Sequence, residues 1–314
     1  MNLLSNFSPD IEIYSIDEAF LKFKGFQENF DLLSYGKQIK KTVTQGTGIP
    51  ISVGFAPTKA LAKVANKIAK KFPSQTESVH LIDSEEKRIK ALKWLPVEDI
   101  WGIGRQHSKR LKNEGINTAY DFTLMSKFWV QKNLSIVGLR LQNELQGIPC
   151  LDLETPADKK NIATTRSFDA NYTDYELIKE RVSTFAVACA TKLRKQKSCC
   201  NALMVFIHTN RHRKDLPQYS RNIVLKLPYP TNSNIELAKF ALQGLDKIFK
   251  KGFAYKKAGV IVMDFTPENT EQIMLFENSN PKHKLLMNTI DKINDAIGTT
   301  KIKLGSQDIK KTWK

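Results

Sequence analysis

The sequence contains no long hydrophobic run. A membrane-spanning helix needs roughly 18 apolar residues in succession, and no stretch of the 314-residue chain approaches that length. The beginning of the chain also lacks the basic segment and the apolar stretch of a secretory signal. These two absences predict a soluble, cytoplasmic protein with no membrane partner.

Cysteine is scarce as well. The chain has 4 cysteines, and none of them forms the C-x-x-C pair that is typical of structural zinc sites. Cys199 and Cys200 are adjacent in an apolar segment, which favours a core strand in a reducing compartment. We therefore expect no structural zinc site.

Acidic residues are outnumbered by basic ones. The chain has 32 Asp and Glu against 49 Lys and Arg, which gives a formal net charge of +17. Such an excess attracts polyanions by long-range steering and indicates nucleic acid as a partner. The alternative is a lysine-rich surface that is merely solvated, and composition alone leaves both interpretations open.

Two adjacent carboxylates, Asp17 and Glu18, interrupt a segment that is otherwise rich in β-forming residues. Oxygen ligands suit Mg²⁺, which usually takes one or two protein carboxylates and fills its other positions with phosphate and water. The alternative is an acidic turn in water. Adjacent strand residues point to opposite faces, so both side chains can reach one ion only if the backbone bends. We therefore predict a strand, a sharp turn and a strand over residues 11–23.

Residues 58–71 are predicted to form an amphipathic helix that begins after Pro57. One face is apolar. The other face carries four lysines: Lys59, Lys63, Lys67 and Lys70. Like charges on one face repel one another unless an anion lies nearby, whereas a simple solvated stripe is the alternative.

A glycine-containing motif, Gly102-Ile103-Gly104, precedes a helical stretch that carries Arg105 and Lys109. This pattern predicts a helix-hairpin-helix, in which backbone N–H groups beside a helix N-terminus face a phosphate. Such contacts position DNA without reading its bases. The alternative is a tight turn between two helices with no ligand.

The region after residue 161 is predicted to follow a β-α-β-β-α-β order, which is that of the ferredoxin-like split βαβ. The strands are expected at 162–168, 202–208, 222–226 and 257–265, and the helices at 174–195 and 235–249. Residues 305–314 are basic and are expected to be mobile.

The segment Ser15-Ile16-Asp17-Glu18-Ala19-Phe20 resembles the signature of Y-family translesion DNA polymerases. Further matches follow in family order: Ser52-Val53-Gly54-Phe55-Ala56-Pro57-Thr58-Lys59, Trp101-Gly102-Ile103-Gly104, Arg166-Ser167-Phe168 and Gln272-Ile273-Met274-Leu275-Phe276. The pattern is similar to the bacterial UmuC type, the catalytic subunits of SOS mutagenic polymerases. This resemblance covers nearly the whole chain.

The resemblance implies a multidomain α+β (mixed α/β) architecture. Residues 1–93 correspond to an incomplete palm, 94–157 to a helix-hairpin-helix thumb, 158–266 to a ferredoxin-like little finger, and 267–314 to a tail with a clamp-binding peptide. The implied activity is error-prone, template-directed DNA synthesis across lesions in the SOS response.

The resemblance also implies roles for particular residues. Asp17 and Glu18 would bind catalytic Mg²⁺, and Lys70 would contact the triphosphate of the incoming dNTP. The residues that match DNA contacts are Gly102, Ile103, Gly104, Arg105, Lys109, Arg166 and Ser167. Gln272, Leu275 and Phe276 match the peptide that docks in the bacterial sliding clamp, although a strand packing on its own domain is the alternative. Processed UmuD and a recombinase filament are further implied partners.

One family feature has no counterpart in the sequence. Full-length members open with a strand that carries the first metal-bridging aspartate, and Asp10 lies in a setting that does not match it. We therefore expect a truncated member with an incomplete two-metal site and with doubtful activity on its own. The rival hypothesis is a non-catalytic DNA- and clamp-binding protein.

Overall fold

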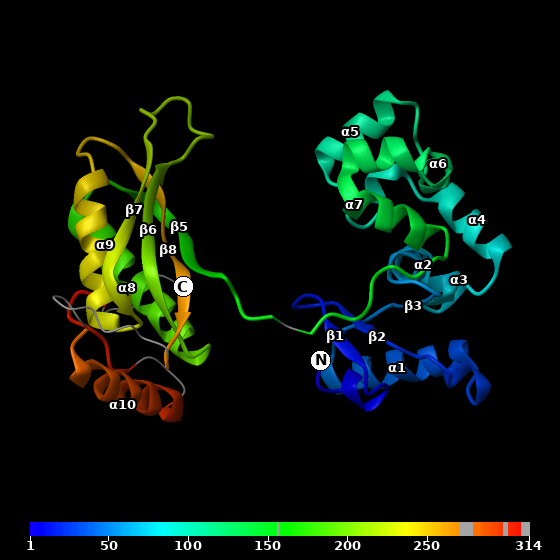
Figure 1. The fold of residues 1–314 in the computed structure, drawn as a ribbon, viewed down its shortest axis with the longest axis horizontal. Coiled ribbons are helices and arrows are strands. Elements are labelled where there is room, and N and C mark those ends of the chain that lie inside the picture. Colours follow the sequence, from blue (N-terminus) through cyan, green and yellow to red (C-terminus); the bar gives the residue numbers. More distant parts are fainter. Residues whose placement is uncertain (156, 270–278, 298–300, 309–314) are drawn as a thin grey trace. The chain divides into compact units, whose positions relative to one another are not determined.

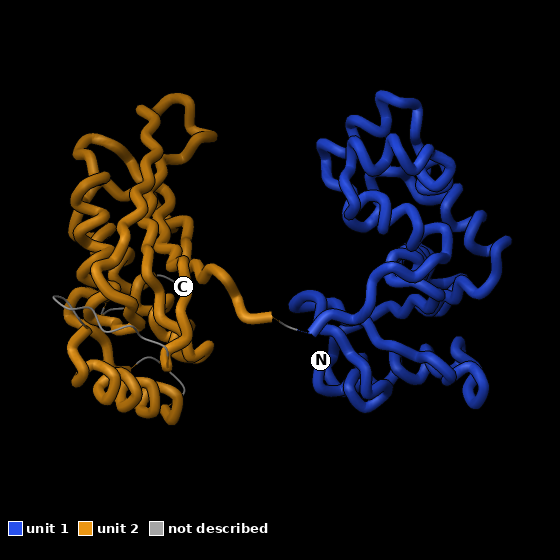
Figure 2. The backbone as a smooth tube through the Cα atoms, in the orientation of Figure 1, with its two compact units in different colours: residues 1–156 blue, residues 157–314 orange. Residues whose placement is uncertain are grey.

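The computed structural model describes residues 1–155, 157–269, 279–297 and 301–308. The chain divides into two compact units, residues 1–156 and 157–314 (Figure 2). Within the described residues no helix is both long and apolar enough to cross a membrane.

Unit 1 begins with a small α/β region around two short pairs of strands. β1 (Ile11–Ile13) pairs antiparallel with β2 (Ala19–Leu21), and β3 (Val53–Phe55) pairs parallel with β4 (Val79–Leu81). α1 (Leu32–Thr47) lies against β3 and β4. The predicted strand, turn and strand around Asp17 are therefore present.

The helices of unit 1 share a second core. They are α2 (Lys59–Lys71), α3 (Pro73–Thr76), α4 (Glu85–Trp94), α5 (Arg105–Asn113), α6 (Ala119–Leu124) and α7 (Lys127–Leu145). Thr58 caps α2, because its hydroxyl accepts a hydrogen bond from the Leu61 amide. Leu61 and Val64 of α2 belong to the same buried cluster as Leu111 and Phe122. The apolar core therefore continues across residue 93, where the sequence predicts a domain boundary.

One buried carboxylate fixes the start of α2. Glu144 is 0% exposed, and its Oε2 accepts a hydrogen bond from the Ala60 amide at 3.1 Å. Its Oε1 accepts from the amides of Cys150 (2.6 Å) and Leu151 (3.0 Å). A negative charge at a helix N-terminus is stabilised by the helix dipole and by the N–H groups that face it. Glu144 thus joins α2, the end of α7 and the segment that leaves unit 1.

Unit 2 is a four-stranded antiparallel sheet with two helices on one face (Figure 1). The strands are β5 (Asn161–Tyr172), β6 (Ser198–Thr209), β7 (Ser220–Thr231) and β8 (Tyr255–Pro267). The helices are α8 (Tyr175–Lys195) and α9 (Asn234–Ile248). Their apolar faces meet alternate strand residues such as Leu203, Val205 and Ile207, which form the core of this unit.

The order of the elements is the predicted β-α-β-β-α-β, whereas the order of the strands across the sheet is β5-β8-β6-β7. The second and fourth strands are therefore central, and this arrangement differs from the ferredoxin-like sheet, whose first and third strands are central. Both helical crossovers still skip one strand, as in a split βαβ. Hydrophobic periodicity predicts the elements, but strand order depends on pairing between segments far apart in the sequence.

The C-terminal residues were expected to be mobile, and for residues 305–308 this expectation is wrong. α10 (Pro281–Ile297) contacts the unit through Met287, which is 1% exposed, and through an ion pair from Asp291 to Arg194 at 2.6 Å. Further along, Asp308 forms an ion pair with Arg181 of α8, and both side chains are almost completely buried. The segment therefore belongs to the fold of unit 2.

We expect Asp308→Ala to lower the stability of unit 2 by about 3–5 kcal/mol, because it leaves the buried Arg181 guanidinium without its carboxylate. Hydrogen exchange of peptides from β6 and β8 measures this opening free energy. Asp295→Ala is the matched control: its ion pair with Lys195 is exposed, so its loss should cost less than about 1 kcal/mol. Equal effects of both changes would contradict a structural role for the buried pair.

Candidate functional site: an acidic turn beside a basic helix and a helix-hairpin-helix

The acidic motif lies on a tight turn between β1 and β2. The backbone N–H groups of Tyr14 and Ser15 both donate to the Glu18 carbonyl at 3.1 Å. Adjacent side chains of a straight strand point to opposite faces, and this turn interrupts that alternation at Asp17 and Glu18. The bend that both carboxylates need in order to reach one ion is therefore present. Both carboxylates are accessible to solvent at this turn.

Asp17 is held in its ionised form. The Ser15 hydroxyl donates to Asp17 Oδ1 at 2.6 Å, and this hydrogen bond keeps the pKa of the carboxyl below its usual value. The positive charges of Lys63 and Lys70 lower the pKa of Asp17 further. Asp17 is therefore negatively charged at neutral pH, and the charge of Lys70 lies close enough to act on it.

Three lysines of α2 form ion pairs with acidic residues from other segments of unit 1. Lys59 Nζ lies 2.7 Å from Glu12 Oε2 of β1, and both side chains are largely buried. Lys63 forms an ion pair with Glu18. Lys67 Nζ lies 2.9 Å from Asp99 Oδ2. These acids relieve the repulsion that the sequence predicts along the lysine face, and two of them attach β1 and the acidic turn to α2.

The carboxylates of the turn are the candidate ligands for the metal that the resemblance implies. Within the described residues, no group of three or more His, Cys, Asp and Glu side chains gathers as a metal site. Two carboxylates suit one hard cation whose other positions are filled by water and phosphate oxygens. The carboxylate of Glu18 is shared with Lys63, so a cation has to compete with that ammonium group. The residues fit one Mg²⁺ ion better than a pair.

An aromatic cluster lies between the acidic turn and the glycine motif. Trp101 Nε1 donates to Tyr14 Oη at 3.0 Å. The ring centroids of Trp101 and Tyr14 are 5.5 Å apart, and those of Trp101 and Phe20 are 5.7 Å apart. Tyr14 and Phe20 stand on the two sides of the acidic turn. The structure therefore brings two motifs together that are more than 80 residues apart.

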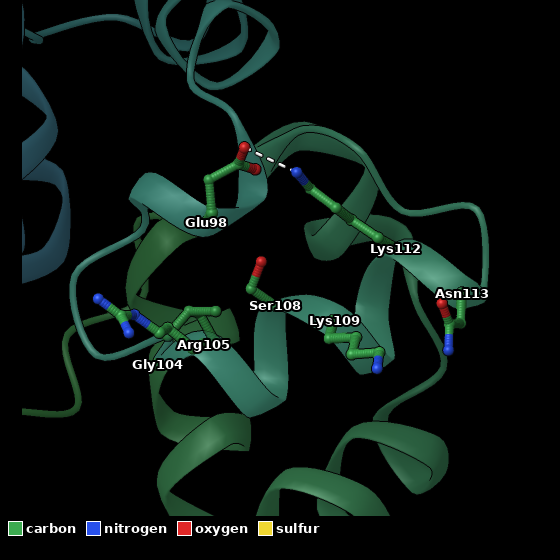
Figure 3. A pocket seen from close by; sticks show the side chains of 8 residues that line it. Glu98, Gly104, Arg105, Ser108, Lys109, Lys112 and Asn113 are labelled. Carbon is green, nitrogen blue, oxygen red and sulfur yellow. Dashed lines mark hydrogen bonds and ion pairs between the residues drawn. The ribbon is translucent and has the colours of Figure 1, made fainter. Parts of the chain in front are cut away.

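The glycine motif shapes a cavity of about 550 Å³ at the start of α5 (Figure 3). Gly102 has a φ of +90°, a backbone conformation that favours glycine. Gly104 is the N-cap of α5 and supplies no side-chain acceptor, so the first N–H groups of the helix are free to face a ligand. Arg105 and Lys109 line the cavity from the same helix.

The cavity also contains groups that the sequence did not suggest. Ser108 and Lys112 line it, and Lys112 Nζ forms an ion pair with Glu98 at 2.7 Å (Figure 3). The Ile103 side chain is only 8% exposed and belongs to the apolar core. The backbone of Ile103, and not its side chain, is therefore the part that can face a ligand.

In unit 2 the predicted DNA contacts lie on β5, an edge strand. Arg166 and Ser167 are exposed, and Ser167 is paired in register with Lys257 of β8. Strand residues that alternate with the core positions, such as Phe206 and His208, face away from α8 and α9. Burial and the charges of Lys257 and Arg211 lower the pKa of His208, so this imidazole is neutral at pH 7.

Gln272, Leu275 and Phe276 lie outside the described residues. The described residues on both sides of them are hydrogen-bonded to unit 2. The Glu268 amide donates to the Lys197 carbonyl at 2.9 Å, and the Ser279 hydroxyl donates to both oxygens of the Glu236 carboxylate.

Sequence reasoning missed several residues of this site. Glu12 and Glu144 are buried acids, and Tyr14 is the acceptor for Trp101. The sequence carries a weak signal for Glu12. Glu12 alternates with Ile11 and Ile13 in a strand pattern, so its side chain lies on the opposite face of the strand from theirs. Nothing local marks Glu144, because its partners are 84 residues earlier and a few residues later in the chain.

Models of one protein family match both units. The impB/mucB/samB family matches residues 1–67, and its C-terminal domain matches residues 159–275. A domain of unknown function, DUF4113, matches residues 284–314.

Curated relatives extend the match over the whole chain. Protein UmuC of Salmonella typhimurium strain LT2 is 36% identical over 100% of this chain and 75% of its own length. Protein SamB of the same species is 35% identical over 99% of this chain and 74% of its own length. A solved Y-family DNA polymerase chimera of Dbh and Dpo4 shares the fold, with a TM-score of 0.60 and 21% identity over 85% of this chain and 74% of its own. The chain therefore belongs to the impB/mucB/samB family and is a UmuC-like member of the Y-family translesion DNA polymerases.

Proposed function

We propose that this chain binds primer–template DNA and an incoming dNTP and catalyses template-directed nucleotidyl transfer at the turn of residues 14–18. The observation that carries this proposal is the contact between the acidic turn of Asp17 and Glu18 and the basic face of α2, where Lys63 pairs with Glu18. A carboxylate turn beside lysines suits a cation and a triphosphate together, since each group balances the charge of the other.

Each residue has a role in this proposal. Asp17 and Glu18 would hold Mg²⁺, and Lys63 would give up its ion pair with Glu18 to that cation. Mg²⁺ in that place supplies charge neutralisation at the reacting phosphate. Lys70 neutralises the triphosphate, and so favours departure of pyrophosphate when the primer 3′-OH attacks the α-phosphate.

The DNA is held through its phosphates at two places in this proposal. In unit 1 the backbone of Gly102–Gly104 and the side chains of Arg105 and Lys109 accept a phosphate at the cavity of Figure 3. In unit 2 Arg166 and Ser167 contact the DNA backbone from β5. Neither place reads base identity, as lesion bypass requires.

A non-catalytic DNA- and clamp-binding protein is the second candidate. Two observations favour it: Lys63 already balances Glu18, and the two carboxylates suit one metal ion better than two. Such a protein keeps the phosphate contacts and lacks the chemistry.

Primer extension with dNTPs and Mg²⁺ separates the two candidates. The catalytic candidate predicts that the purified chain extends a primer and that Asp17→Ala slows extension by about 100-fold or more, because each ~1.4 kcal/mol of lost transition-state stabilisation costs tenfold. Asp10→Ala is the control, since Asp10 lies just before β1 and away from the turn. Tight primer–template binding without any extension would favour the non-catalytic candidate.

The phosphate contacts predict a steep salt dependence of DNA binding. We expect log–log slopes near −0.9 for each neutralised phosphate, and the double change Arg105→Gln and Lys109→Gln should reduce the slope by about 1 for each lost contact. Fluorescence anisotropy over a salt series measures both. Lys87→Gln is the control, because Lys87 lies on α4 and pairs with Asp83, which precedes that helix. A flat salt response would rule out binding through phosphates.

We further propose a bacterial sliding clamp as a partner, bound through Gln272, Leu275 and Phe276, with Leu and Phe as anchors. The double change Leu275→Ala and Phe276→Ala should abolish binding to an immobilised clamp in surface plasmon resonance. Leu285→Ala removes a leucine that is 75% exposed on α10 and serves as the control. Clamp binding that survives the double change would refute this assignment.

Family membership alone supports processed UmuD and a recombinase filament as further partners. The same membership supports action on the chromosome in the bacterial cytoplasm.

A further inference from the structure

We propose that Trp101 is a positioning residue that couples the phosphate site at the start of α5 to the acidic turn. This inference rests on the proposed function, because it assigns a phosphate to the first place and the reaction to the second. Trp101 contacts neither the phosphate nor the reacting atoms, and it acts through the residues that it holds.

The backbone of Trp101 is fixed in the core of unit 1. Its neighbours Ile100 and Ile103 are 3% and 8% exposed and belong to the cluster that also contains α2. The Ile103 amide donates to the Ile100 carbonyl at 3.0 Å, which closes the turn that Gly102 makes possible with its φ of +90°. Gly104, the N-cap of α5, follows three residues after the indole. The indole is therefore attached to the same fixed backbone turn that forms the phosphate site.

The other end of the contact belongs to the acidic turn. Tyr14 accepts the indole N–H through its hydroxyl, and its own backbone N–H donates to the Glu18 carbonyl. Phe20, which touches both rings, continues the turn into β2. The indole thus meets the two residues that stand on either side of Asp17 and Glu18.

The lysines of α2 cover the same aromatic cluster. Lys63 Nζ lies 5.6 Å from the centroid of Tyr14, and Lys59 Nζ lies 4.8 Å from that of Phe20, both within cation–π range. Lys63 also pairs with Glu18. The cluster is therefore held by α2 as well as by Trp101, and the acidic turn depends on both for its place.

This arrangement has a kinetic consequence. A misplacement of about 1 Å between reacting groups can cost up to about 100-fold in rate even when binding is intact. Loss of the indole leaves Gly104, Arg105 and Lys109 able to hold a phosphate. The change should therefore appear in the rate of the chemical step and hardly at all in DNA affinity.

The test uses the full chain in single-turnover primer extension with titrated primer–template. We expect Trp101→Ala to slow extension by about 10- to 100-fold and to change the DNA dissociation constant, measured without divalent cation, less than threefold (roughly 0.65 kcal/mol). Trp101→Phe and Tyr14→Phe each remove the hydrogen bond and keep a ring, so each should have a smaller effect, and the double variant should be no slower than the slower single variant. Trp94→Phe, an aromatic change at a residue that contacts Phe72, is the control and should leave extension unchanged.

A second measurement does not depend on turnover. Electron paramagnetic resonance of Mn²⁺ gives the affinity of the acidic turn for a cation with and without primer–template. We expect DNA to tighten Mn²⁺ binding in the wild-type chain, and this linkage to disappear in Trp101→Ala and to weaken in Tyr14→Phe. If DNA still tightens Mn²⁺ binding and extension is unchanged in these variants, the positioning role of Trp101 is overturned and the proposed function is not. A wild-type chain that binds neither primer–template nor Mn²⁺ would overturn the proposed function, and the coupling with it.

Discussion

The carboxylate of Glu144 is the interaction on which the arrangement of unit 1 depends. A buried carboxylate is tolerated only when hydrogen bonds replace the water that it has lost, and Glu144 receives these bonds from the amides of Ala60, Cys150 and Leu151. Its backbone carbonyl accepts a further bond from the Thr58 hydroxyl at 2.7 Å. The side-chain carboxylate and the backbone carbonyl of Glu144 therefore both hold the first turn of α2.

The direction of α2 then determines what the acidic turn can do. Lysines spaced along its polar face reach Glu12, Glu18 and Asp99, which come from segments on both sides of it in the sequence. Glu12 also accepts a hydrogen bond from the Glu154 amide, so the same ion pair holds the chain as it leaves unit 1. The basic helix thus organises the carboxylates as well as balancing their charge.

Local chemistry made much of the fold predictable. The helix at residues 58–71 has both a cap and a 3.6-residue period, and the structure has it at Lys59–Lys71. The buried Cys199 and Cys200 follow from an apolar strand pattern. The strand order of unit 2 was not predictable from one sequence, because each segment carries a similar period and only long-range register separates the possible orders.

The candidate site also has parts that were predictable and parts that were not. The acidic turn and the glycine turn depend on neighbours in sequence, so the residues themselves indicated both turns. The contacts that join these turns, Lys63 with Glu18 and Trp101 with Tyr14, link residues 45 and 87 positions apart and leave no local mark. The burial of Asp308 was hidden for a similar reason: a polar, basic-flanked segment is typical of a mobile end, whereas contacts with α8 such as the ion pair with Arg181 and the hydrogen bond to Thr184 show otherwise.

That ion pair affects how the protein matures on the ribosome. The helices and strands of unit 1 find their core partners within residues 1–156, so this unit can fold while the rest of the chain is still being made. Unit 2 is different, because Asp308 emerges 127 residues after Arg181. At a synthesis rate of roughly 5–20 residues per second, the Arg181 guanidinium waits about 6–25 s for its carboxylate. The buried apolar cluster of unit 2 ends at Val262, so this ion pair forms only after every residue of that core has been made.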